Sequence, residues 1–118
     1  MRVSKNRLNS SLRKEILNSF IQTLDDLKGA REKEIFLNDF FNLLELDTYI
    51  KRLAIAYWLK KGRSYENIKT NLKVSSATIA VVEKQLETPG FKLALKKMEA
   101  EEWANVWSEK IKKLASRR

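Results

Sequence analysis

Residues 62–86 read GRSYENIKTNLKVSSATIAVVEKQL, and this stretch decides the fold. Two short helices that cross steeply need a small core of their own, with apolar residues at fixed offsets in both helices and in the turn. The residues at those offsets are Ile68, Leu72, Val74, Ile79 and Val82. Ser64 can cap the first helix, and Ser75 or Ser76 can cap the second. The stretch therefore predicts a helix-turn-helix.

The second of these helices is expected to enter the major groove of duplex DNA with its N-terminal turns leading. Small residues let its backbone approach the bases, hydroxyls can bond to them, and apolar side chains can touch a thymine methyl group. The residues expected to face bases are Ser75, Ser76, Ala77, Thr78, Ala80, Val81, Lys84 and Gln85. The residues expected to bind phosphates are Lys60, Lys61, Arg63, Lys69 and Lys73. Ala80 and Val81 make this face poor in hydrogen-bonding groups, so a protein-interaction module on the same scaffold is the alternative.

Outside this stretch, apolar residues recur every three or four positions, which predicts amphipathic helices. The first helix is expected from residue 10 or 11 to about 28, and the second from about 30 to 41. The third is expected to follow a cap at residue 42 and to run to about 61, and the last to begin at 91. Ser11 is the expected cap of the first helix, Gly29 is placed to end it in a left-handed conformation, and Gly62 is expected to end the third helix. Asn42 and Glu45 have the spacing of a capping box.

The order of these segments predicts an all-α fold of about six helices, because no segment alternates like a strand. The pair Pro89–Gly90 is expected to break the chain before the last helix. The helix that begins after Asn42 is expected to bury Leu46, Ile50, Leu53, Ala54, Tyr57 and Trp58. The last helix carries Leu95, Met98, Trp103, Val106, Trp107, Ile111 and Leu114. We expect one domain, with a basic arm at 1–9, a core and dimerisation part at 10–61, the helix-turn-helix at 62–88 and the final helix at 91–118.

Charge is unevenly distributed along the 118 residues, whose net charge is +9. Residues 1–14 carry five basic residues and no acidic one, residues 15–50 carry three against eight, and residues 51–73 carry seven against one. Basic clusters release counterions from a phosphate backbone, which favours double-stranded DNA as the partner, although a basic protein can owe its charge to solubility alone. The N-terminal arm is expected to lie along DNA phosphates, with an anionic membrane surface as the alternative.

The composition also disfavours several classes of protein. There is no cysteine and no histidine, which removes disulfides, thiolate metal sites, and the commonest general base and metal ligand. The carboxylates within 32–39 and 99–102 are interpreted as solvated helix faces, so neither catalysis nor a metal is expected. No apolar run reaches the length of a membrane span, and the start lacks the apolar stretch of a signal peptide. The expected location is the cytoplasm, on the nucleoid.

Five short segments carry a resemblance to a known family. They are NLLEL at 42–46, KRLAIA at 51–56, SYENI at 64–68, SSATI at 75–79 and FKLAL at 91–95. From about Phe36 to Met98 the chain resembles the Trp-repressor family, and within it the YerC/YecD branch. The resemblance implies an intertwined homodimer in which the N-terminal helices of two chains wrap each other and each chain presents one reading head to an operator half-site. An ordinary monomeric core is the alternative.

Departures from the family pattern bear on ligands. Arg52 resembles one of the two arginines that hold the corepressor in the tryptophan repressor, but Val81, or Ala80 in a shifted register, stands where the second would fall. The resemblance therefore does not support tryptophan as a ligand, and it leaves Arg52 as a candidate contact for an unknown small-molecule effector. Lys73 replaces the usual glycine of the turn, and Lys69 replaces a usual small residue. The extension after Met98 lies outside the pattern.

Overall fold

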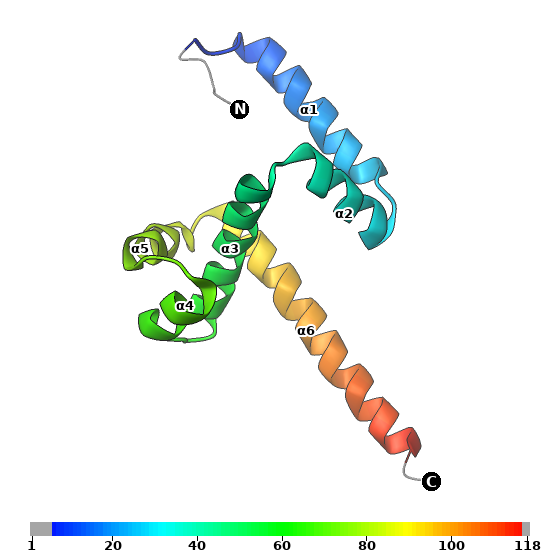
Figure 1. Ribbon diagram of the computed structural model, residues 1–118. Helices are drawn as coiled ribbons and strands as arrows, with labels where there is room; N and C mark the ends of the chain where they lie inside the picture. Colours follow the sequence, from blue (N-terminus) through cyan, green and yellow to red (C-terminus); the bar gives the residue numbers. More distant parts are fainter. Residues whose placement is uncertain (1–5, 117–118) are drawn as a thin grey trace. The chain divides into compact units, whose positions relative to one another are not determined.

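The computed structural model describes the backbone of residues 6–116 and the side chains of residues 6–102 (Figure 1). Over that range the chain forms six helices and no strand, which confirms the predicted all-α class. The helices are α1 (Ser10–Asp26), α2 (Gly29–Phe40), α3 (Leu43–Lys60), α4 (Tyr65–Leu72), α5 (Ser76–Gln85) and α6 (Pro89–Ser116). The chain divides into two compact units, Met1–Leu46 and Asp47–Arg118, which we describe separately.

The first unit holds α1 and α2. Asn9, and not the predicted Ser11, caps α1, because its Oδ1 accepts a hydrogen bond from the Ser11 backbone N–H at 2.9 Å. Gly29 has the predicted positive φ of 67°, although α1 already ends at Asp26. The ring of Phe20 lies 5.4 Å from that of Phe40, and this aromatic contact joins α1 to α2.

Most of the apolar stripe on α1 stays exposed within this chain, and none of the residues of α1 or α2 is buried. The exposed large apolar side chains in the first unit are Leu8, Leu12, Ile16, Leu17, Ile21, Ile35, Phe40, Leu43 and Leu44. Soluble proteins rarely leave contiguous apolar surface of this kind uncovered. The stripe on α1, which the sequence predicts to be a core face, is therefore not covered by the other described residues of its own unit.

Local capping fixes both ends of α3. Asn42 Oδ1 accepts from the Glu45 backbone N–H at 2.9 Å, and Glu45 Oε1 accepts from the Asn42 backbone N–H at 3.0 Å, which confirms the predicted capping box. At the other end Gly62 has a φ of 81° and its N–H bonds to the Leu59 carbonyl at 3.0 Å. The next N–H, of Arg63, reaches the Trp58 carbonyl at 3.0 Å, completing a Schellman motif.

The second unit has its core where α3, α4, α5 and α6 meet, with α3 lying between α4 and α6 (Figure 1). The buried residues are Ile55, Ala56, Ile68, Ile79, Val82 and Leu95. The prediction for α3 was partly wrong, since Ile50 and Leu53 are 56% and 38% exposed. Ile55 and Ala56 lie in the core of this unit, whereas the face of α3 that carries Ile50 is not covered by the described residues of the same unit.

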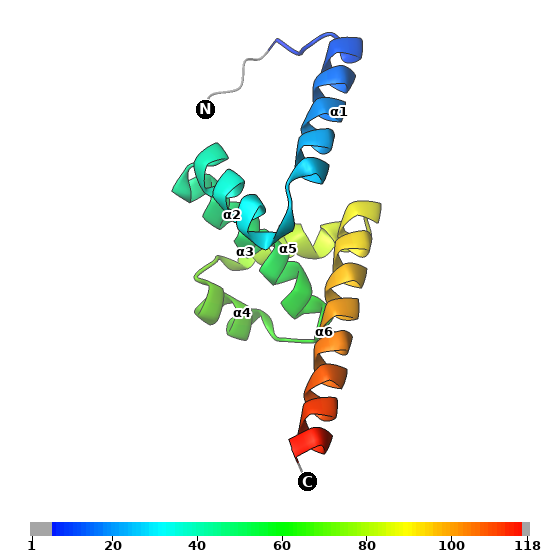
Figure 2. The same ribbon diagram turned by 90° about the vertical axis from the view of Figure 1, so that its right-hand side faces the viewer.

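Helix α6 begins at Pro89, so the pair Pro89–Gly90 does not break the chain as predicted. Proline is tolerated at the first helical position because the N–H that it lacks would have no partner within the helix there. The Lys92 backbone N–H bonds to the Thr88 carbonyl at 3.0 Å, closing the first turn. From there α6 runs as one continuous helix (Figure 2). The apolar residues expected along its last part, from Trp103 to Leu114, lie outside the described side chains.

No helix among the described residues has the length and apolar character needed to cross a membrane. Within the same residues, no three acidic side chains gather closely enough to hold a metal ion.

Candidate nucleic-acid interface

Helices α4 and α5 form the predicted helix-turn-helix. Ser64 Oγ accepts from the Asn67 backbone N–H at 3.1 Å, which caps α4. Ser75 Oγ accepts from the Thr78 backbone N–H at 3.1 Å, which caps α5 and settles the choice between Ser75 and Ser76. Both caps satisfy backbone donors that would otherwise be unpaired at the helix starts.

The turn between the two helices contains a residue in a strained conformation. Lys73 has φ 57° and ψ 51°, the left-handed region, and its N–H bonds to the Lys69 carbonyl at 3.1 Å. A side chain with a Cβ costs roughly 1 kcal/mol there, which is why glycine is common at such positions. The core outweighs this cost, because Ile68 and Ile79 are fully buried and Val74, in the turn, packs against them. The five apolar offsets predicted from the sequence all lie in or against this core.

The outer side of α5 carries most of the residues predicted to face bases. Six of the eight are exposed, with Val81 57% exposed, whereas Ala80 and Gln85 are half-buried. The hydroxyls of Ser75 and Thr78 lie 3.0 Å apart and bond to each other, so they are already engaged in the cap. Gln85 Oε1 is buried and has no hydrogen-bond partner. Base contact by these residues stays a prediction, and Ser76, Ala77 and Lys84 are exposed for it.

All five residues predicted to bind phosphates are exposed, but their side chains make different contacts. The Arg63 guanidinium lies 4.0 Å from the centre of the Trp58 ring and donates to Asn67 Oδ1 at 3.4 Å. Lys61 is paired with Glu102 of α6. Lys60 lines a separate cavity with Lys92 and Lys96. The two remaining residues, Lys69 and Lys73, lie next to the turn, close to the start of α5.

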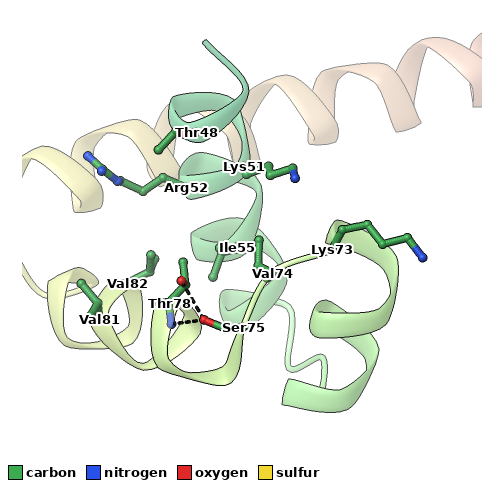
Figure 3. Close-up of a pocket in the computed structure, with 10 residues that line it drawn as sticks. All are labelled: Thr48, Lys51, Arg52, Ile55, Lys73, Val74, Ser75, Thr78, Val81 and Val82. Carbon is green, nitrogen blue, oxygen red and sulfur yellow. Dashed lines mark hydrogen bonds between the residues drawn. The ribbon is translucent and has the colours of Figure 1, made fainter. Parts of the chain in front are cut away.

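Arg52 lines a cavity of about 440 Å³ between α3 and α5 (Figure 3). Thr48, Lys51 and Arg52 reach it from α3, Lys73 from the turn, and Val81 from α5. Figure 3 shows Arg52 extending on the α5 side of the cavity and Lys51 toward the Lys73 side. The cavity therefore combines cationic groups with an apolar wall, which is suited to a small anion with an apolar part. Thr48 and Lys51 were not among the predicted site residues, although their spacing to Arg52 and Ile55 places all four on one helix face.

A second feature missed from the sequence ties α3 to α6. Lys61 Nζ lies 2.8 Å from Glu102 Oε2, and the Tyr57 hydroxyl donates to the same carboxylate oxygen. The hydrogen bond with Lys61 lowers the pKa of Glu102, while the bond with Glu102 raises the pKa values of Lys61 and Tyr57. Glu102 is thus a structural contact between helices and not simply part of a solvated face.

Replacing Glu102 with glutamine is expected to lower the melting temperature slightly at neutral pH. Since folding lowers the Glu102 pKa, the wild-type protein is more stable than the variant above the ordinary pKa of 4.5, and this difference in stability is lost as the pH falls below that value. Since folding raises the pKa values of Tyr57 and Lys61, the advantage is also lost as the pH rises beyond their ordinary values of 10.0 and 10.5. Melting curves of both proteins between about pH 3 and pH 11 measure this. A difference independent of pH would contradict it.

Known proteins resemble this chain in sequence and in fold. The family model described as Trp repressor protein matches residues 15–99. YerC of Bacillus subtilis (strain 168), described as an uncharacterized protein, is 31% identical over 75 residues, which are 64% of this chain and 72% of YerC. The crystal structure of a TrpR-like protein from Eubacterium eligens matches with a TM-score of 0.69 at 24% identity, covering 77% of this chain and 96% of that one. The family match begins within α1 and ends at Glu99, so the later part of α6 lies outside the shared pattern.

Proposed function

Because the chain belongs to the Trp-repressor family of DNA-binding regulators, we propose that it is a sequence-specific, non-catalytic transcriptional regulator that reads the major groove with α5. The observation that carries this proposal is the helix-turn-helix itself. Its core buries Ile68, Ile79 and Val82, and the opposite side of α5 is left to solvent. A helix held in this way can enter a groove without losing any contact that the fold needs. A protein with this role acts on the nucleoid in the cytoplasm.

The charges around α5 support the same proposal. Lys84 is exposed on α5, Lys69 is in the last turn of α4, and Lys73 is in the turn that precedes α5. Cations on both sides of a reading helix can pair with phosphates and so fix its register in the groove. Ser76 and Ala77, the first residues of α5, are small enough to let the helix approach base edges.

Selection of bound sequences from a random duplex pool tests this function. We expect a palindromic motif whose half-sites lie about 10–10.5 base pairs apart, because a two-fold dimer presents two copies of α5. The affinity for the selected duplex should fall steeply with salt, by a log–log slope of about 0.9 for each phosphate contacted. If no duplex is retarded at low salt, the alternative function as a protein-interaction module gains support, with the exposed Val81 at its centre.

We further propose that the regulator is a homodimer. The support is the apolar surface of the first unit, where Leu12, Ile16 and Ile21 of α1 are 46–50% exposed. A second copy can cover such a stripe with its own, since identical apolar faces are self-complementary about a two-fold axis. Sedimentation at micromolar concentration measures the state directly. A protein that stays entirely monomeric would exclude the dimer while leaving the reading head intact.

Arg52 is the residue that we propose as the contact for an effector. Its guanidinium shares the cavity with Lys51 and Lys73, and α5 supplies Val81 where a second arginine would be needed to resemble the tryptophan site. A thermal-shift series with small carboxylates and phosphate esters tests this site. Stabilisation by an anion that persists unchanged in Arg52→Ala would refute the assignment.

A further inference from the structure

Tyr65 and Glu83 join the two helices of the helix-turn-helix at the end remote from the turn. The Tyr65 hydroxyl, from the first residue of α4, donates to Glu83 Oε1 in the second half of α5 at 2.7 Å. Neither residue belongs to the sets predicted to contact bases or phosphates. We propose that this hydrogen bond is a latch that sets the angle between α4 and α5 and thereby positions the reading helix on DNA. The inference rests on the proposed function.

The positions of the two residues suit this role. Tyr65 precedes Lys73 by eight residues, and Glu83 follows Ser75 by eight. At the rise of an α-helix each arm is about 12 Å long, so the turn and the latch close a triangle with two equal sides. With arms of that length, a change of about 1 Å in the span of the latch changes the angle between the helices by roughly 5°. Because a change of about 1 Å exceeds the roughly 0.5 Å that a binding constellation tolerates, a small loosening is costly for base recognition.

The latch is separate from the forces that keep the helices folded. The buried contacts of Ile68, Ile79 and Val82 hold α4 and α5 together whether or not the hydrogen bond forms. Apolar packing keeps the two helices together but allows small changes in the angle between them, whereas a hydrogen bond is directional and fixes a distance. The bond to Glu83 raises the pKa of Tyr65, so the phenol keeps its proton and remains a donor under ordinary assay conditions.

A set of conservative variants separates the latch from the charge of Glu83. Tyr65→Phe removes the donor and keeps the ring. Glu83→Met removes the acceptor at similar size, while Glu83→Gln removes the charge but keeps an acceptor oxygen. Glu66→Gln, an exposed residue of α4, is the matched control for loss of one negative charge. If the latch matters, Tyr65→Phe, Glu83→Met and their double variant should behave alike, and Glu83→Gln should retain much of the wild-type behaviour.

The measurement is the ratio of the affinity for the selected duplex to that for a scrambled duplex, at one salt concentration. We expect the ratio to fall about tenfold in Tyr65→Phe and Glu83→Met through the selected duplex alone, because phosphate contacts dominate binding to the scrambled one. An unchanged ratio in these variants would contradict the latch. The proposed function would not be affected by that result, because the wild-type protein would still be selective. Parallel losses on both duplexes with a lowered melting temperature would also overturn the latch, because they indicate a merely structural bond. A wild-type protein that shows no selectivity at all would instead refute the proposed function, and this inference with it.

Discussion

Ile79→Ala is expected to destabilise the protein by about 3–4 kcal/mol, within the range measured for removing most of a buried isoleucine. Ile79 has no exposed surface and lies in α5, where it contacts the small core shared by α3, α4 and α6. Only six described residues are buried, and four of them have no exposed surface, so few neighbouring side chains can move to refill the cavity. Helix α5 should therefore be the first element to lose its position.

Chemical denaturation at a fixed protein concentration measures this loss, since a dimer would make the apparent stability depend on concentration. Val81→Ala is the matched control, because the same helix carries Val81 with 57% of its surface exposed. We expect the control to change the free energy of unfolding by no more than about 0.5 kcal/mol. If the two variants were equally stable, the core as described would be wrong.

Much of the helix-turn-helix could be predicted because its determinants are local. Ser64 and Ser75 act within one turn of their own helices, and a cap is recognisable from the few residues that follow it. The offsets of Ile68 and Ile79 follow from the geometry of two helices joined by a short turn. The same reasoning placed Lys73 in the turn but could not weigh its left-handed strain against the packing.

Errors arose where local rules had competing solutions. Asn9 and Ser11 are both good caps, and only the backbone shows that Asn9 Oδ1 reaches the first free N–H groups. Proline can interrupt a chain or begin a helix, and Pro89 begins α6. For α3 the apolar residues surround much of the helix, so their spacing could not show that Ile55 and not Ile50 would be buried.

Contacts between residues far apart in the chain could not be predicted from the sequence. The bond between Tyr65 and Glu83 and the pair of Lys61 with Glu102 each join separate helices, and no spacing rule links their positions. The cavity around Arg52 is an intermediate case. Its α3 residues share a helix face that could have been identified, but the approach of α5 to that face depends on how the helices pack.

The double variant Lys73→Glu with Lys84→Glu is expected to lower the affinity for the selected duplex by at least about a hundredfold at 0.1 M salt. Each change removes one cation beside α5 and puts an anion near a phosphate, so attraction is replaced by repulsion. Both residues are exposed, so the charges do not contribute to a buried network. Glutamate and lysine both carry a Cβ and meet the same strain in the left-handed backbone at position 73, so the turn should keep its conformation.

Lys96→Glu with Lys97→Glu is the control for net charge, because it makes the same overall change on exposed residues of α6. Titrations of both double variants at several salt concentrations separate local contacts from the general field of the protein. The variant with Lys73→Glu and Lys84→Glu should lose about two phosphate contacts, so the log–log slope of its affinity against salt should decrease by roughly 1.8. The control should keep the wild-type slope. Equal losses in the two variants would mean that overall charge drives binding. In that case α5 would not be the element that lies in the groove.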